Sequence, residues 1–204
     1  MYHISNFGNP MRILGITGGI GSGKSVVARV FETMGIPVYN TDLASKEISN
    51  SSQTVRAQLS DKFGETIYKE GLLDRTMLAL LVFSKPEYLK FVNSVIHPKV
   101  LFNFLKWKEQ HTEKLFIGIE TAVLFESGFD KWVDVSINIF APIELRIQRV
   151  QKREGLDKRV ILNRINNQCL DRERIHKADY TIVNDNQQAV LSQIENLIAK
   201  LQRC

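Results

Sequence analysis

Short apolar runs alternate with stretches of helical periodicity along most of the chain. Five of these runs have the length and the side chains of buried strands: Arg12–Thr17, Pro37–Asn40, Leu115–Glu120, Val133–Phe140 and Tyr180–Val183. Strands separated by helices are typical of a parallel sheet that helices cover. The pattern therefore predicts an α/β fold with a doubly wound, five-stranded parallel sheet, in which ligands bind at the carboxyl ends of the strands.

The helical stretches are concentrated between the second and third predicted strands. No strand signal interrupts the chain from about Leu43 to Thr112, and helices are predicted over Leu43–Ser49, Thr54–Phe63, Asp74–Phe83 and Pro86–Gln110. Pro98 is expected to break or kink the last of them, because proline lacks a backbone N–H and clashes with the preceding turn. Later helices are predicted over Pro142–Glu154, from Asp157 to about Cys169, and over Gln187–Leu201.

These predictions divide the chain into parts with different roles. Residues 11–42, 113–141 and 178–204 form a core that contains the sheet. Residues 43–112 form a helical insertion that could hold an acceptor substrate, and residues 142–177 form a lid with the helix that follows it. Residues 1–10 are polar and are expected to be a disordered extension, with Met11 a candidate natural start.

The composition narrows the class of protein. The 204 residues are 44% hydrophobic and 24% charged, which is ordinary for a globular protein. No apolar run approaches the roughly 20 residues of a membrane span, and residues 1–10 lack the apolar region of a secretory signal. Cys169 and Cys204 are far apart in the sequence, which favours a reducing compartment and a cytoplasmic protein. The net charge of +5 suits polyanionic substrates, and no basic tract is long enough to indicate nucleic acid.

One motif carries most of the chemical information. Residues 18–25 read Gly-Gly-Ile-Gly-Ser-Gly-Lys-Ser, which matches G-x-x-x-x-G-K-S/T in full, between a predicted strand and a helix predicted over Ser25–Met34. The backbone of such a loop and the helix N-terminus hold phosphate oxygens, while Lys24 lies between the β- and γ-phosphates and Ser25 ligates Mg²⁺. The motif therefore predicts ATP and Mg²⁺ as ligands, held by Gly19, Ile20, Gly21, Ser22, Gly23, Lys24, Ser25 and Val26. The alternative is a glycine-rich turn without a ligand.

Asp42 follows the second predicted strand, at the sheet edge that faces this loop. A carboxylate there can accept a proton from an attacking hydroxyl or help to position Mg²⁺. The alternative is that Asp42 caps the helix that begins at Leu43. From position alone the two interpretations are equally good.

Other charged residues are weaker candidates. Arg146, Arg149 and Arg153 share one face of the predicted lid helix and could close over transferring phosphates, or could form a solvated basic face. Glu120 and Glu126 could act in the second shell of Mg²⁺, bind substrate, or face solvent. Because no aspartate ends a strand in the Walker B manner, the metal is expected to rely on Ser25, Asp42, phosphates and water.

Taken together, the motifs resemble those of the dephospho-coenzyme A kinase family. The matches follow one another in order from about Met11 to Leu201, nearly the whole chain. They are Leu14–Ser25, Gly35–Val38 with the turn to Asp42, His97-Pro98, Val123–Glu126, Arg149–Arg153, Gln168 and Ala178–Asn184.

The resemblance implies a P-loop NTP hydrolase-type fold like that of nucleoside-monophosphate kinases. It implies transfer of the ATP γ-phosphoryl group to the ribose 3′-hydroxyl of dephospho-coenzyme A, the last step of coenzyme A biosynthesis, with residues 43–112 holding this acceptor. By position it makes Asp42 the general base, Arg149 and Arg153 lid arginines on the phosphates, and Asn184 part of the adenine loop. Asp42 is also expected to bind the acceptor, together with His97 and Glu126.

Two residues depart from the family pattern. Asn40 replaces the first of two acidic residues, which leaves Asp42 alone, and Val26 replaces a threonine near the α-phosphate. The nearest alternative function is another P-loop small-metabolite or nucleoside-monophosphate kinase, and a nucleotide-dependent switch protein is less favoured because N-K-x-D is lacking. The protein is expected to be a monomer or small homo-oligomer that binds neither nucleic acid nor membrane.

Overall fold

The computed structural model describes residues 10–203, so the predicted extension lies outside the described residues except for Pro10. The described chain divides into two units. The sheet unit contains the residues up to Tyr39 and the chain from Gln110 onward, and the helical unit is Asn40–Glu109, against the predicted 43–112. The helices of residues 142–177 belong to the sheet unit in this division.

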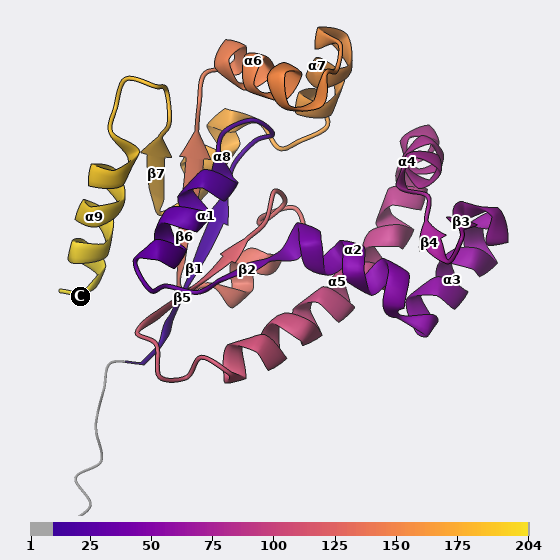
Figure 1. Cartoon of the computed structure of the whole chain (residues 1–204), viewed down its shortest axis with the longest axis horizontal. Helices are drawn as coiled ribbons and strands as arrows, with labels where there is room; N and C mark the ends of the chain where they lie inside the picture. Colours follow the sequence, from indigo (N-terminus) through magenta and orange to yellow (C-terminus); the bar gives the residue numbers. More distant parts are fainter. Residues whose placement is uncertain (1–9, 204) are drawn as a thin grey trace, which may run out of the picture. The chain divides into compact units, whose positions relative to one another are not determined.

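The sheet unit contains the five strands that the sequence predicts. They are β1 (Arg12–Thr17), β2 (Val38–Asn40, whose last residue begins the helical unit), β5 (Phe116–Glu120), β6 (Val135–Phe140) and β7 (Tyr180–Val183), in the order β2-β5-β1-β6-β7. The pairs β1–β5, β1–β6 and β6–β7 are parallel. The parallel α/β fold is therefore confirmed, and the central strand β1 delivers the phosphate-binding motif to the carboxyl edge of the sheet (Figure 1).

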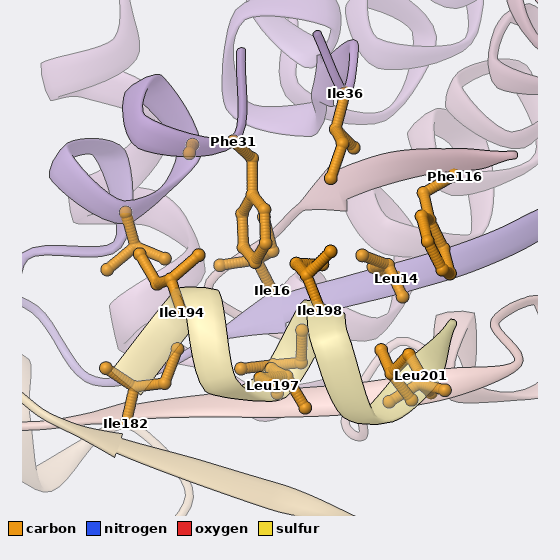
Figure 2. Packing of buried hydrophobic residues seen from close by; sticks show 14 of the residues in the cluster. Leu14, Ile16, Phe31, Ile36, Phe116, Ile182, Ile194, Leu197, Ile198 and Leu201 are labelled. Carbon is orange, nitrogen blue, oxygen red and sulfur yellow. The ribbon is translucent and has the colours of Figure 1, made fainter. Parts of the chain in front are cut away.

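Two helices bury apolar side chains against this sheet. Helix α1 (Lys24–Thr33) contributes Val27 and Phe31, and the C-terminal helix α9 (Val190–Leu201) presents Ile194, Leu197, Ile198 and Leu201 to the same core. In Figure 2, Ile198 points from α9 towards Ile16 and Leu14 of β1, which belong to the same cluster. Each fully buried Ile or Leu contributes about 1.5–3 kcal/mol, so α9 fixes the strand from which the phosphate-binding loop departs.

Three helices connect β6 to β7. Helix α6 (Ile143–Glu154) and helix α7 (Lys158–Asn166) form a small cluster of their own, in which Ile147, Val150 and Ile161 pack with Ile20 of the loop. Helix α8 (Asp171–Lys177) was not expected, and α7 ends three residues before the predicted Cys169. The short helix α8 lacks an apolar stripe, and its one buried side chain is that of Arg174.

The helical unit consists of α2 (Thr41–Ser51), α3 (Gln53–Phe63), η1 (Glu65–Ile67), α4 (Arg75–Ser84) and α5 (Pro86–Glu109). A two-stranded antiparallel hairpin, β3 (Tyr68–Lys69) and β4 (Leu72–Leu73), was not expected. Helix α5 continues through Pro98, so of the predicted break or kink the break is wrong, and the kink stays a prediction. The buried side chains of Val92, Val95, Ile96, Val100 and Phe104 on both sides of the proline stabilise the continuous helix.

Among residues 10–203, no helix combines the length and the apolar character needed to cross a membrane.

Candidate active site

The motif of residues 18–25 forms a loop between β1 and α1, as the sequence predicts. Gly23 lies at φ 96°, in the left-handed region, and a Cβ there would stand 2.2 Å from Nδ2 of Asn184. Any other residue at this position would both strain the backbone and displace Asn184. The glycine therefore permits the loop to approach the segment that follows β7.

The carbonyl groups of the loop are held from outside by side chains of later segments. The Ile20 carbonyl accepts from Nε of Arg146 at 2.7 Å, and the Ser22 carbonyl accepts from Nδ2 of Asn184 at 2.8 Å. Nη1 of Arg149 donates to the carbonyls of Gly21 and Ser22 at 3.4 and 3.3 Å. Among the described residues, the N–H groups of Gly21 and Gly23 donate no hydrogen bond, so both remain available to a phosphate.

Arg149 joins this loop to the chain after β7. Its Nη2 donates to the Asn184 carbonyl at 3.0 Å and to Oδ1 of Asn186 at 2.6 Å. Burial lowers the pKa of Arg149, but an arginine side chain stays protonated in proteins, so Arg149 brings a positive charge to the loop. Arg149 and Asn184, both predicted from the sequence, therefore lie together at the loop.

Lys24 folds back onto the loop in this structure. Its Nζ donates to the Gly18 carbonyl at 2.8 Å and to the Gly19 carbonyl at 3.4 Å. Neutral carbonyl oxygens are weaker partners for an ammonium group than phosphate oxygens are. The lysine is thus held beside the loop, where an incoming phosphate can replace these carbonyls.

Ser25 and Glu120 form the best candidate for a metal site. Oγ of Ser25 donates to Oε1 of Glu120 at 2.7 Å. Glu120 is the last residue of β5, lies beside Ile16 in the register with β1, and is only 5% exposed. A hydroxyl and a carboxylate are oxygen donors that suit Mg²⁺, which also keeps phosphate and water ligands. A glutamate therefore stands at the strand end where the sequence pattern offers no aspartate.

No three His, Cys, Asp or Glu side chains gather into a candidate metal site within the described part of the chain. A Mg²⁺ ion at Ser25 and Glu120 would consequently depend on the phosphates for much of its coordination.

Two remaining predicted residues of the sheet unit, Arg153 and Glu126, have recorded partners outside the loop. Arg153 is exposed and pairs with Glu154, which also binds Arg164. Oε1 of Glu126 accepts from the backbone N–H of Cys169 at 3.1 Å. The contact of Arg153 with ATP and that of Glu126 with an acceptor stay predictions.

A family model described as "Dephospho-CoA kinase" matches residues 12–189. The chain belongs to the dephospho-CoA kinase family. The dephospho-CoA kinase of Bacteroides fragilis is 41% identical over 189 residues, which cover 92% of each protein. A crystal structure of a Thermus thermophilus protein has a TM-score of 0.82 and 32% identity, covering 95% of this chain and 99% of that one. The dephospho-CoA kinase from Campylobacter jejuni shares the fold, with a TM-score of 0.66, 24% identity, and coverage of 94% and 99%.

In this member of the dephospho-CoA kinase family, Asn40 and Asp42 lie at the start of α2 and have different roles there. Oδ1 of Asn40 accepts from the N–H of Leu43 at 2.9 Å, so Asn40 is the N-cap of α2. Asp42 lies in the first helical turn, where it is exposed and makes no capping hydrogen bond. The interpretation of Asp42 as the helix cap is therefore wrong, and the departure at Asn40 supplies that cap.

His97 is half-buried on α5. The sequence predicts that it binds the acceptor substrate, as Asp42 is also expected to do. Burial lowers the pKa of His97, which favours the neutral imidazole at pH 7. A neutral imidazole can donate one hydrogen bond and accept another, but it brings no charge to a phosphate. Its contact with an acceptor stays a prediction.

Proposed function

We propose that this protein transfers the γ-phosphoryl group of ATP to the ribose 3′-hydroxyl of dephospho-coenzyme A, giving coenzyme A and ADP. The observation that carries the proposal is the family match over residues 12–189, because it spans the phosphate-binding loop and the helical unit together. A cytoplasmic protein that is a monomer or a small homo-oligomer is part of the same proposal.

The donor side rests on the loop. The N–H groups of Gly21 and Gly23, the ammonium group of Lys24 and the guanidinium group of Arg149 bind the phosphates and stabilise the charge that develops during transfer. Ser25 and Glu120 would hold Mg²⁺, which would supply positive charge next to the phosphates. Ser25 Oγ donates its hydrogen to Glu120 at 2.7 Å, so its lone pairs would remain available to the ion.

The acceptor side rests on the helical unit. Asp42 is exposed and is not engaged in capping, so its carboxylate can accept the proton of the 3′-hydroxyl as the γ-phosphoryl group is transferred. His97 and Glu126 bind the acceptor, and residues 142–177 cover the phosphates with Arg149 and Arg153. Positioning and charge stabilisation supply most of the rate acceleration, as is general for phosphoryl transfer.

The proposal is tested by measuring ADP release in a coupled assay with one acceptor at a time. Dephospho-coenzyme A, adenosine, AMP and pantetheine phosphate are compared at equal concentrations with ATP and Mg²⁺. We expect turnover with dephospho-coenzyme A and background rates with the others. Turnover with another acceptor alone would replace the proposed substrate while leaving the loop assignment intact.

A further inference from the structure

We propose that Arg146 is a positioning residue, which turns the loop at Ile20 into its phosphate-binding form before a nucleotide arrives. Arg146 is held in place for this by Asp171, which Arg174 also binds. The inference rests on the proposed function only in requiring that a nucleotide binds the loop, and it holds for any acceptor.

The guanidinium group of Arg146 lies directly against the loop. The residue is 1% exposed, and its Nε donates to the Ile20 carbonyl at 2.7 Å. A Cβ added at Gly19 would stand 2.2 Å from Nη2 of Arg146, so only glycine leaves room for the arginine at this point. The arginine therefore contacts two consecutive residues of the loop.

The geometry of the peptide unit determines which way the N–H of Gly21 points. The carbonyl of Ile20 and the N–H of Gly21 belong to the same trans peptide unit, and in such a unit the two groups point in opposite directions. Because Arg146 holds the Ile20 carbonyl on its own side, the N–H of Gly21 must point away from Arg146. That N–H donates no hydrogen bond to any of the described residues.

The same geometry recurs two residues later with other partners. Asn184 and Arg149 hold the Ser22 carbonyl at 2.8 and 3.3 Å, which turns the N–H of Gly23 away from them. Arg146 and Asn184 thus control different N–H groups, and a change at one leaves the other in place. This separation makes the role of Arg146 measurable on its own.

A second contact fixes Ile20 from the same part of the chain. The Ile20 N–H donates to Oε1 of Gln168 at 2.8 Å, so side chains from α6 and from the segment that follows α7 hold both backbone groups of this residue. Ile20 also packs against the apolar cluster of Ile147 and Val150. The loop is therefore clamped at Ile20 by three kinds of contact.

The buried charges of Arg146 and Arg174 lower the stability of the fold, which points to a role other than stabilisation. Nη1 of Arg146 donates to both carboxylate oxygens of Asp171 at 3.0 and 2.8 Å, and Nη2 of the buried Arg174 donates to the same carboxylate. Two buried cations therefore share one anion. Nη2 of Arg146 and both Nε and Nη1 of Arg174 have no partner among the described residues. Such groups destabilise a fold relative to apolar side chains of similar size.

The protein contains a matched pair for comparison. Arg164 and Glu154 make an ion pair at 2.8 Å, the same separation as between Arg146 and Asp171, but the Arg164 side chain is 44% exposed, against 1% for that of Arg146. Among the described residues, Arg164 makes no hydrogen bond or ion pair with the loop, and an exposed pair of this kind contributes little to stability. Arg164→Gln is therefore the control for Arg146→Gln.

The experiment measures ADP binding by calorimetry and the glycine amide signals by ¹⁵N NMR on the full chain, without any acceptor. For Arg146→Gln we expect ADP affinity to fall about 10- to 100-fold, the loss that follows removal of a charged hydrogen bond. The Gly21 amide signal of the free protein should broaden while that of Gly23 stays sharp. Arg164→Gln should bind ADP like the wild type, and Arg146→Lys, which keeps one charged donor, should recover part of the affinity.

Several outcomes would overturn the proposal. Wild-type ADP affinity in a folded Arg146→Gln protein would do so, as would equal broadening of Gly21 and Gly23, because a merely structural role loosens the whole loop. If Arg146→Gln does not fold, Gln168→Leu removes the other clamp on Ile20 without burying or exposing a charge. It should weaken ADP binding about threefold to tenfold, and an unchanged affinity would equally reject the clamp.

Discussion

The two units of the protein differ in how far apart in the sequence their hydrogen-bonded residues lie. In the sheet unit, side chains reach the loop from far along the chain: Asn184 is 162 residues from Ser22, and Arg146 is 126 residues from Ile20. In the helical unit the recorded side-chain bonds are shorter in range, from the caps that Asn40 and Asp74 provide three residues ahead to the bond that joins Leu73 to Asn50, 23 residues away. A site of remote contacts is organised only when the whole unit is folded, whereas capped helices follow from neighbouring residues. Substitutions should therefore damage the sheet unit through its site and the helical unit through its individual helices.

The largest effect is expected for Lys24→Ala, which removes the charge that binds the transferring phosphate. We expect kcat/KM for ATP to fall by about 10⁴, since both transition-state stabilisation and affinity are lost. The measurement is steady-state ADP release, with Lys152→Ala on the exposed face of α6 as the control. ATP binding and turnover near the wild-type values would contradict the role of the loop.

Asp42→Asn should have the next largest effect and should act on the acceptor side. Loss of a general base is expected to lower kcat by about 10²–10³, with little change in the affinity for ATP. Because Asn40 and not Asp42 caps α2, the stability of the protein should hardly change. Asp61→Asn, an exposed carboxylate on α3, is the control. A kcat near that of the wild type would contradict the role of Asp42 as the general base.

Glu120→Gln tests the metal side of the sheet unit. The amide still accepts from Ser25 but carries no charge for Mg²⁺, so we expect the Mg²⁺ concentration for half-maximal rate to rise about tenfold. Calorimetry of ADP binding with and without Mg²⁺ gives a second readout, in which the Mg²⁺-dependent gain in affinity should shrink. Glu195→Gln on α9 is the control, and an unchanged Mg²⁺ requirement would assign Glu120 to packing alone.

Asn40→Ala tests the local character of the helical unit. Removing the cap of α2 should lower the free energy of unfolding by about 1 kcal/mol, as measured by urea denaturation. Asn40→Asp keeps a capping oxygen and should restore the stability. If both variants lose the same amount, the contribution of Asn40 comes from the strand β2 that it ends and not from the cap.

The smallest effect concerns His97 and pH. Because burial lowers the pKa of His97 below its ordinary 6.5, the unfolded chain binds more protons than the folded protein between these two values. Stability should therefore rise with pH through this range and lose less on acidification in His97→Gln. Urea denaturation at pH 5, 6 and 7 measures the slope, with the exposed His176→Gln as control. Equal slopes in wild type and His97→Gln would contradict the burial of a neutral imidazole.

The strands and the phosphate-binding loop could be predicted because their signals are contiguous in the sequence. Strands β1 and β7 have the predicted bounds, and Gly18–Ser25 is a complete motif. The hairpin of Tyr68–Leu73 could not be predicted in the same way, because strands of two residues are too short to show an alternation. Its turn at Glu70-Gly71, both at positive φ, was the one local indication.

The residues around the loop were harder to place than the loop itself. Glu120 ends a strand that is buried throughout, a position that could have indicated a strand-end carboxylate. The partners of Arg146 could not be predicted, because Asp171 and Arg174 lie on a short helix without apolar periodicity. Contacts between residues more than 100 positions apart leave no local pattern in the sequence. The contacts of Arg146 and Asn184 with the loop are therefore visible only in the folded structure.

The central strand β1 is synthesised well before the two strands that pair with it. Strand β1 is made first, but both of its neighbours, β5 and β6, follow the whole helical unit in the sequence. At about 5–20 residues per second, β1 waits roughly 5–25 s on the ribosome before both partners exist. During that time the apolar side chains of Ile13, Leu14 and Ile16 have no sheet to enter. The helical unit is one continuous segment, Asn40–Glu109, and can fold within this interval. The sheet unit is completed later and is therefore the one that most needs protection from aggregation as a nascent chain.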